Sequence, residues 1–295
     1  MNLVHITCAI TNFLKTCFMR TISYAFQSGD AVQKADFAFP PTSNKDFPSC
    51  GVFAFAKSGS VLVNAIVRDL MAAASVPVID WPAVWYWQGV DTGSFQADLS
   101  EVFPARGYCF AGFREIPRSF LGAPAIRRLR KIIVVRDPRD MLVSRYFSTK
   151  YSHGFEPRGT AQVAQLMRQL IDDGQTDLDS YCLHYSWIVN ADFFMHRDII
   201  LDPRTKVFRY EDFLYDKHNL IDGICSWFDL PLSQEQLNAI VTAQESIPDV
   251  ERPNYHVRQA HPGDYRRKLR SNTIQALNSV LKDYLEAFGY ETECA

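Results

Sequence analysis

The sequence lacks an excess of charge of either sign. It carries 31 Lys and Arg residues against 33 Asp and Glu residues, a formal net charge of −2. A protein that binds nucleic acid through its overall field carries a basic excess. The balance therefore argues against a nucleic-acid partner, and any anion that the protein binds must be held by local groups.

Paired cysteines are missing as well. The cysteines are odd in number, scattered and without a CxxC pair: Cys8, Cys17, Cys50, Cys109, Cys182, Cys225 and Cys294. Disulfide frameworks and zinc sites need paired spacings. Free thiols in a reducing compartment fit the pattern better, so we expect a cytoplasmic protein with no metal site.

No apolar run reaches the roughly 18 to 20 residues that a membrane span needs. Residues 1–29 contain no acidic residue, and their apolar side chains between Leu3 and Phe18 follow helical spacing. No small-residue cleavage site follows this stretch. We expect residues 1–46 to be an amphipathic extension whose helix packs on the domain, stays partly mobile, or makes peripheral contact with a membrane.

From about Phe47 onward, apolar runs typical of buried strands alternate with helical patterns. The predicted strands are 51–56, 108–113, 131–136 and 206–211, and the clearest helices are 60–74, 140–148, 160–173 and 274–288. Strands interleaved with helices indicate a parallel sheet covered on both faces. The sequence predicts an α/β fold: a single domain, 47–295, with a central parallel β-sheet flanked by helices.

One stretch, "FAFAKSGSVLVNAI" (53–66), leaves a predicted strand and enters a helix through Lys-Ser-Gly-Ser. Backbone N–H groups and the positive end of the helix converge at such a turn and favour anions. Lys57 adds a full charge, Ser58 and Ser60 add hydroxyl donors, and Gly59 allows close approach. A Walker loop would need Gly-x-x-x-x-Gly-Lys-Ser/Thr, which is absent here.

A second stretch, "KIIVVRDPRDMLVSRYFS", ends a predicted strand with Arg136 and places Ser144 in the following helix. The planar guanidinium and the short hydroxyl could clamp one phosphate from two directions. The alternative is an ordinary salt-bridged Arg-Asp turn.

Together these stretches resemble the sulfotransferases that use 3′-phosphoadenosine-5′-phosphosulfate (PAPS). The family's Tyr-Pro-Lys-Ser-Gly-Thr motif looks like residues 55–60, and its Arg-x-Pro-x-Asp turn with a later serine is matched by Arg136, Pro138, Asp140 and Ser144. Its Tyr-Glu-Asp is similar to 210–212, and its Arg-Lys-Gly-x-x-Gly-Asp-Trp segment to 258–265. The resemblance covers roughly residues 47–290, in the same order.

The resemblance implies a P-loop-like fold and transfer of a sulfuryl group from PAPS, with 3′,5′-adenosine diphosphate (PAP) as product and no metal. It implies that Lys57 is catalytic and that in-line displacement delivers the group to a hydroxyl or amine of a small-molecule or glycan acceptor. The residues that it places around the nucleotide are Lys57, Ser58, Gly59, Ser60, Val61, Leu62, Arg136, Ser144, Tyr210, Arg258, Gln259 and Ala260.

The sequence departs from the family pattern at two points. Leu62 stands where members often have a tryptophan that stacks on adenine. At the position of the usual catalytic histidine stands Arg114, which cannot act as a base. Some relatives use glutamate, so Glu115 is the nearest candidate base, unless it only pairs with a neighbouring arginine; His153 and His184 are further candidates.

The acceptor is indicated only by an aromatic stretch, "VIDWPAVWYWQGVD" (78–91), which holds Trp81, Trp85, Tyr86 and Trp87. Aromatic faces suit sugars, phenols and flat cations, but the same rings could simply be core. The family's dimer signature is absent in register, so the sequence predicts no oligomeric state. Two other classes compete, a P-loop nucleotide kinase or NTPase and a non-catalytic nucleotide-binding module.

Overall fold

The computed structural model describes residues 20–28, 31–90, 98–114, 122–151, 161–244 and 261–292. Its strands are β1 Thr21–Ser28, β2 Ala31–Ala38, β3 Cys50–Ala54, β4 Val78–Asp80, β5 Cys109–Phe113, β6 Arg130–Val135 and β7 Thr205–Arg209. Its helices are α2 Ser60–Ala73, α3 Trp81–Gln88, α4 Leu99–Val102, α5 Pro124–Arg127, α6 Pro138–Tyr151, α7 Ala161–Asp172, α8 Leu178–Ile200, α9 Tyr210–Phe213, α10 Lys217–Phe228, α11 Gln234–Ala243, α12 Asp264–Lys268, α13 Ser271–Val280 and α14 Lys282–Ala287.

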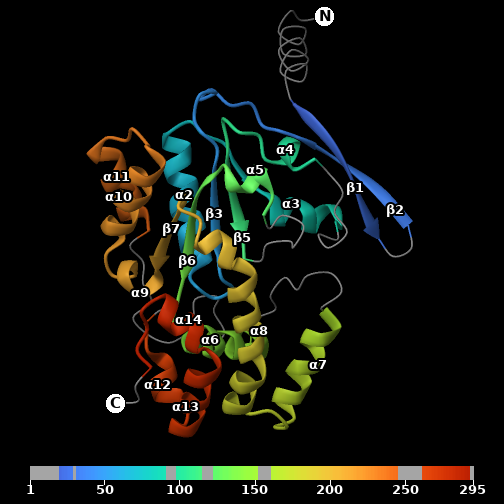
Figure 1. Cartoon of the computed structure of the whole chain (residues 1–295), viewed down its shortest axis with the longest axis vertical. Helices are drawn as coiled ribbons and strands as arrows, with labels where there is room; N and C mark the ends of the chain where they lie inside the picture. Colours follow the sequence, from blue (N-terminus) through green and yellow to red (C-terminus); the bar gives the residue numbers. More distant parts are fainter. Residues whose placement is uncertain are drawn as a thin grey trace, which may run out of the picture.

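Five strands form one sheet in the order β4-β5-β3-β6-β7, and every neighbouring pair is parallel (Figure 1). The four predicted strands correspond to β3, β5, β6 and β7, and the predicted α/β class is confirmed. The edge strand β4 was not predicted, because three residues are too few to show a period. Because the strands are parallel, their carboxyl ends lie at one edge of the sheet.

Alternate residues of each central strand supply two separate hydrophobic cores, one on each face of the sheet. In β6, Ile132 and Val134 pack with the helices α2, α10 and α11, whereas Ile133 and Val135 pack on the opposite side with α6, α8 and α13. Side chains of a strand point to opposite faces in turn. This is why the strands read as continuous apolar runs rather than as alternating ones.

The antiparallel hairpin of β1 and β2 was not predicted, although its sequence shows a period of two. Ile22, Tyr24 and Phe26 are buried, and the ring centroid of Tyr24 lies 6.4 Å from that of Trp81. The hairpin thus packs on the core on the α3 side of the sheet. The helix expected at the chain start lies within residues 1–19, outside the described residues.

The predicted C-terminal helix is divided into α13 and α14 at Leu281. Both parts keep the expected apolar stripe buried, including Ile274, Leu277 and Tyr284. Gly289 has φ 67°, which confirms the predicted left-handed end of the helix. None of the helices that the structure describes combines the length and apolar character needed to cross a membrane.

Candidate active site

Three turns that are far apart in the sequence meet at the carboxyl edge of the sheet. Lys57 follows β3, Arg136 follows β6 and Tyr210 follows β7, and these strands are neighbours in the sheet. Ligands of parallel α/β proteins bind at this edge. The fold therefore brings together the lysine turn, the arginine turn and the tyrosine that were singled out from the sequence.

The lysine turn has an unusual backbone. Lys57 has φ 69° and Gly59 has φ 90°, both in the left-handed region that only glycine enters readily. Ser58 is buried, and its hydroxyl donates to the Phe55 carbonyl oxygen at 2.7 Å. α2 begins directly after Gly59, so the first N–H groups of this helix have no acceptor within it. These groups lie where an anion could accept from them.

The Lys57 side chain reaches α6. Its Nζ donates to Ser148 Oγ at 2.6 Å. Ser148 lies four residues after Ser144 in the same helix, so both hydroxyls share one helical face. Ser148 was not predicted from the sequence, although its four-residue spacing from Ser144 was visible there. The contact joins the lysine turn to the helix that carries the predicted phosphate-binding serine.

Arg136 is nearly buried, with 5% of its surface exposed, and it is incompletely paired. Its Nη1 lies 3.5 Å from the Lys57 carbonyl oxygen, and Nη2 lies 3.8 Å from an Asp140 carboxylate oxygen. Its Nε has no hydrogen-bond partner among the described residues. Buried donors are rarely left unpaired. A phosphate is the kind of group that would satisfy this guanidinium, so the arginine turn fits an anion better than a closed salt bridge.

Asp140 connects the arginine turn to the C-terminal segment. One carboxylate oxygen accepts from Gly263 N at 2.7 Å and the other from Tyr265 N at 2.9 Å. Burial raises the pKa of Asp140 to about 6, while the charge of Arg136 opposes the shift. The segment that directly precedes Gly263 holds the predicted nucleotide residues 258–260. Asp140 therefore fixes the backbone at Gly263 and Tyr265.

The Tyr210 ring packs against both the lysine turn and the arginine turn. A Cβ added to Gly59 would lie 2.5 Å from the Tyr210 ring, and the Arg136 guanidinium lies 4.5 Å from the ring centroid. Burial raises the pKa of the Tyr210 hydroxyl. The next residue, Glu211, accepts from Asp137 N at 2.9 Å and from the Tyr290 hydroxyl at 2.9 Å. The Tyr-Glu-Asp segment thus holds the turns together.

The remaining candidate residues differ in their exposure to solvent. Ser144 and Leu62 are half-buried, and Leu62 packs against the core beneath α2. Val61 is exposed at the start of α2, Arg114 is exposed at the end of β5, and His184 is exposed on α8. The candidates that lie outside the described residues are Glu115, His153, Arg258, Gln259 and Ala260.

The aromatic stretch forms α3, and its rings differ in exposure. Trp81 and Trp85 are buried and stacked, with ring centroids 5.5 Å apart. Trp87 is 72% exposed. Asp80 caps α3 by accepting from Ala83 N at 3.1 Å. The first two tryptophans are therefore core residues, and Trp87 is the ring of this helix that faces solvent most.

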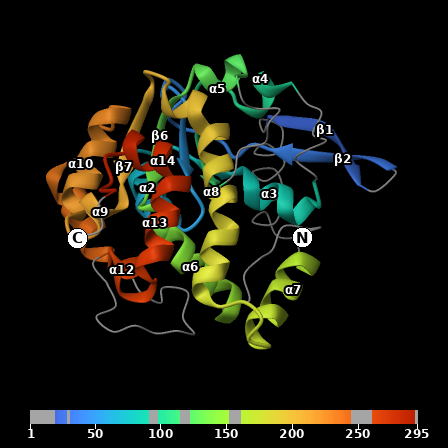
Figure 2. The ribbon, with the colours of Figure 1, turned by 60° about the horizontal axis from the view of Figure 1, so that its bottom comes forward.

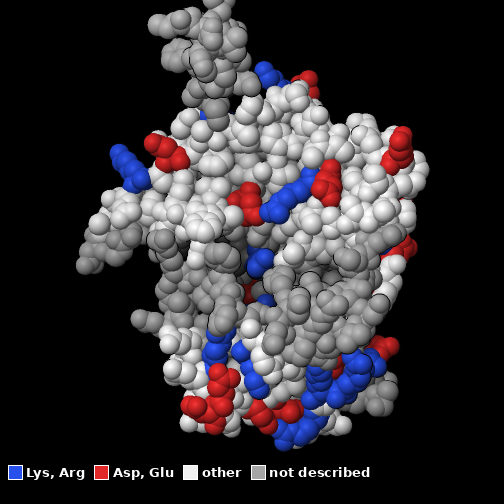
Figure 3. Space-filling model, turned by 180° about the vertical axis from the view of Figure 1, so that it is seen from behind, with Lys and Arg blue, Asp and Glu red and all other residues white. Residues whose placement is uncertain are grey.

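Charged side chains are unevenly distributed over the face seen from behind. Charged side chains of both signs gather on its lower part, where α12 lies, below a central hollow (Figure 3). α12 ends in Arg266, Arg267 and Lys268. Within the described ranges, no group of three His, Cys, Asp or Glu residues is placed to hold a metal ion.

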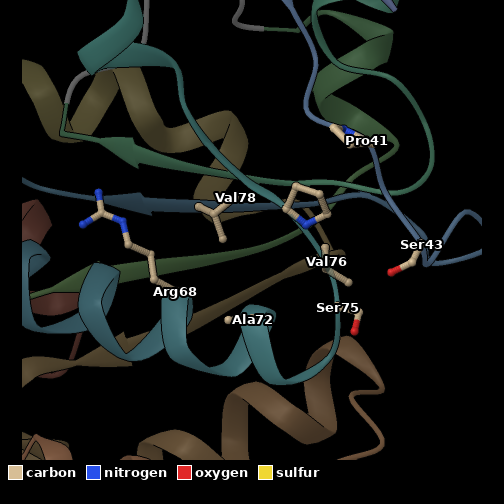
Figure 4. Close-up of a pocket in the computed structure, with 8 residues that line it drawn as sticks. Pro41, Ser43, Arg68, Ala72, Ser75, Val76 and Val78 are labelled. Carbon is tan, nitrogen blue, oxygen red and sulfur yellow. The ribbon is translucent and has the colours of Figure 1, made fainter. Parts of the chain in front are cut away.

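An open pocket lies elsewhere, between α2 and the start of β4 (Figure 4). Arg68 and Ala72 of α2 line one side, and Val76 and Val78 line the other. It borders the amino end of β4, whereas Lys57 follows the carboxyl end of β3. The pocket is therefore separate from the lysine site.

A parallel α/β sheet with a lysine turn after one strand and a buried arginine after the neighbouring strand is an arrangement that suits a phosphorylated ligand. The family model of the sulfotransferase domain matches residues 117–277, more than half of the chain. The chain therefore belongs to the sulfotransferase family, as its motifs predicted, and the predicted sulfotransferase fold is confirmed.

Several solved structures align with most of the chain. Mouse sulfotransferase SULT7A1, complexed with PAP, is 11% identical, covers 81% of this chain and 84% of its own, and has a TM-score of 0.49. Retinol dehydratase in complex with androsterone and PAP is 16% identical, covers 82% and 83%, and has a TM-score of 0.44. No curated protein sequence matches the chain significantly.

Proposed function

We propose that this sulfotransferase takes PAPS as its donor and passes the sulfuryl group to a hydroxyl or amine of a small-molecule or glycan acceptor by in-line displacement. The observation that carries the proposal is the contact between the two turns. Arg136 Nη1 lies 3.5 Å from the Lys57 carbonyl oxygen. Two anion-binding elements this close suit a nucleotide with phosphate at both its 3′ and 5′ positions.

The lysine turn would hold the 5′ end of the donor. Gly59, Ser60 and Val61 bring backbone N–H groups to the start of α2, and Lys57 brings a full charge. Ser58 N already donates to the Phe55 carbonyl oxygen at 3.2 Å, so Ser58 would act by fixing the turn. In a loose transfer transition state, negative charge builds on the leaving phosphate. A cation placed there stabilises the transition state more than the ground state. We assign Lys57 as the catalytic cation, held by Ser148 until it turns to the donor.

The arginine turn would hold the 3′-phosphate. Arg136 offers an unpaired buried Nε, and Ser144 on α6 offers a hydroxyl. A guanidinium can bind two phosphate oxygens at once. We propose that Arg258, Gln259 and Ala260 complete this side, since Asp140 binds the backbone only three residues beyond them. Tyr210 would act on the nucleotide site by supporting both turns.

We retain Glu115 as the proposed base that takes the acceptor proton, with Arg114 beside it. A carboxylate within hydrogen-bond reach of the acceptor could accept its proton as the bond to sulfur forms. The support is the placement of Arg114 at the end of β5, the strand next to β3. Trp87, exposed on α3, is a ring against which an aromatic or sugar acceptor could pack.

The proposal is tested by sulfuryl transfer from labelled PAPS to a panel of phenols, amines, sugars and glycolipids, without added metal. Lys57→Ala is expected to lower turnover at least a hundredfold, equivalent to about 3 kcal/mol of transition-state stabilisation. Lys45→Ala, an exposed lysine away from the turn, serves as control and should keep normal turnover. Both variants should give the circular dichroism spectrum of the unchanged protein.

Three outcomes would contradict this function. Normal turnover of Lys57→Ala would mean that the lysine is not catalytic. A preference for ATP with Mg²⁺ over PAPS would indicate a nucleotide kinase or NTPase. Tight binding of PAP without transfer to any acceptor would indicate a nucleotide-binding module.

We propose that residues 47–295 carry the entire nucleotide site and that, within the extension 1–46, the part before the β1–β2 hairpin makes the peripheral membrane contact. Cys50, Cys109, Cys182 and Cys225 are free thiols, which supports a reducing, cytoplasmic location. Limited proteolysis of the protein with and without lipid vesicles tests this membrane contact, because the contact should protect residues before Arg20 from cleavage.

A further inference from the structure

The outer side of α8 carries a stripe of large apolar side chains. Leu183 is 40% exposed, Trp187 60%, Phe194 45% and Leu201, directly after the helix, 68%. Their spacing places them along one side of the helix. Figures 1 and 2 both show α8 running along the outside of the molecule, in front of α6. We call these four residues the α8 stripe.

None of the four stripe residues belongs to the buried core of its own chain, although the Phe194 ring lies 5.4 Å from that of Phe193. The opposite side of α8 is formed by Tyr181, Tyr185, Val189 and Phe193, which are buried in the core with α6 and α13. A surface helix of a monomer normally has polar residues on its outer side. A row of large apolar side chains on the outside is instead typical of a surface that another molecule covers.

The residues of the α8 stripe are spaced nearly symmetrically on either side of Ala191, which is also exposed. The stripe can therefore pack against a second copy of itself. Trp187 lies four residues before Ala191 and Phe194 three residues after it; Leu183 lies eight before and Leu201 ten after. A helix rises about 1.5 Å per residue. In an antiparallel pair that crosses at Ala191, each tryptophan would therefore meet a phenylalanine, and each Leu183 a Leu201, within about 3 Å of the same level.

Two polar residues on the same side of α8 are also placed symmetrically about Ala191. His184 lies seven residues before Ala191 and Asp198 seven residues after it, and both are exposed. In the antiparallel pair, each imidazole would lie level with the carboxylate of the other copy and could donate to it. The small side chain of Ala191 at the crossing point would let the two helices approach closely.

We propose that α8 pairs with α8 of a second copy of this chain, forming a two-fold symmetric, antiparallel dimer. A surface patch that matches itself under a two-fold rotation is what such an interface requires. A lipid surface fits less well, because α8 carries Asp179, Asp192 and Asp198 against one arginine, Arg197. Membrane-binding helices place basic residues beside their apolar side. The proposal is independent of the sulfotransferase reaction.

Sedimentation velocity between about 1 and 100 µM tests the dimer. The unchanged protein should shift from monomer to dimer over this range, and Trp187→Glu and Phe194→Glu should stay monomeric at the highest concentration. Val32→Glu, which places a charge at an exposed apolar residue of β2, is the control and should dimerise normally. A monomeric unchanged protein, or unaltered dimerisation of both α8 variants, would overturn the proposal.

The polar pair gives a second and more specific test. His184→Asp and Asp198→His should each weaken dimerisation at least tenfold, and the double variant should restore it, because the exchange recreates the pair. Failure of the double variant to recover would overturn the antiparallel register. Binding of the unchanged protein to phosphatidylcholine and phosphatidylserine vesicles, lost in Trp187→Glu while no dimer forms, would show that the stripe contacts lipid instead.

Discussion

The Arg136 guanidinium lies over the ring of Tyr210, 4.5 Å from its centroid, and the same ring lies directly against Gly59. One aromatic side chain that follows β7 thereby contacts the turns after both β3 and β6. A cation stacked on an aromatic face loses little of its hydrogen-bonding capacity, because the N–H groups point outward in the plane of the guanidinium. The stack holds Arg136 in place while leaving its donors for a ligand.

Arg136 should distinguish nucleotides by their 3′-phosphate. Arg136→Lys keeps the charge but loses the planar fork, and it should weaken PAP binding about tenfold; Arg136→Ala should weaken it about a hundredfold. Binding of adenosine 5′-monophosphate should change less than threefold in either variant. Isothermal titration calorimetry measures all four values. An equal loss for both nucleotides would show that Arg136 does not contact the 3′-phosphate.

Lys57 combines a strained backbone with its proposed catalytic charge. Its φ of 69° costs a residue other than glycine about 1 to 2 kcal/mol. Lys57→Gly should therefore be more stable to urea than Lys57→Ala by about 1 kcal/mol, while neither variant transfers a sulfuryl group. Equal stability of the two variants would show that the backbone at residue 57 is not strained.

Gly59 should tolerate no side chain. A Cβ at this residue would lie 2.5 Å from the Tyr210 ring, and its φ of 90° disfavours every other residue. Gly59→Ala must displace the ring that supports Arg136, so PAP affinity should fall at least tenfold and the melting temperature should also fall. Differential scanning calorimetry with and without PAP checks both effects. Gly174→Ala is a matched control, since a Cβ there meets nothing within 4 Å at a similar φ of 69°.

Asp140 should make stability fall as the pH rises from about 4 to 6. Its pKa is raised from 3.8 to about 6 in the folded protein, so the folded state binds more protons than the unfolded state in this window. The contribution of Asp140 to the free energy of unfolding is greatest below pH 4 and decreases by about 3 kcal/mol by pH 6 to 7. The difference in unfolding free energy between the protein and Asp140→Asn should follow this curve. A difference in unfolding free energy that does not vary with pH would contradict the raised pKa of Asp140.

Much of the site was predictable from local sequence. The apolar run before Lys57 predicts a buried strand, and the pattern after Gly59 predicts a helix, so a lysine at their junction had to lie at the carboxyl edge of a parallel sheet. The same reasoning placed Arg136 after β6. The strands of this sheet were recognised wherever they had five or more residues; β4, with three, was not.

The sequence by itself determined at which edge of the sheet the candidate anion-binding residues lie, because strand, turn and helix patterns are local. The tertiary structure decided which side chains meet. It brought Ser148 to Lys57, Tyr210 beneath Gly59 and Arg136, and the amides of Gly263 and Tyr265 to Asp140. These contacts join segments far apart in the chain, and they depend on strand order and helix packing, which no local pattern specifies.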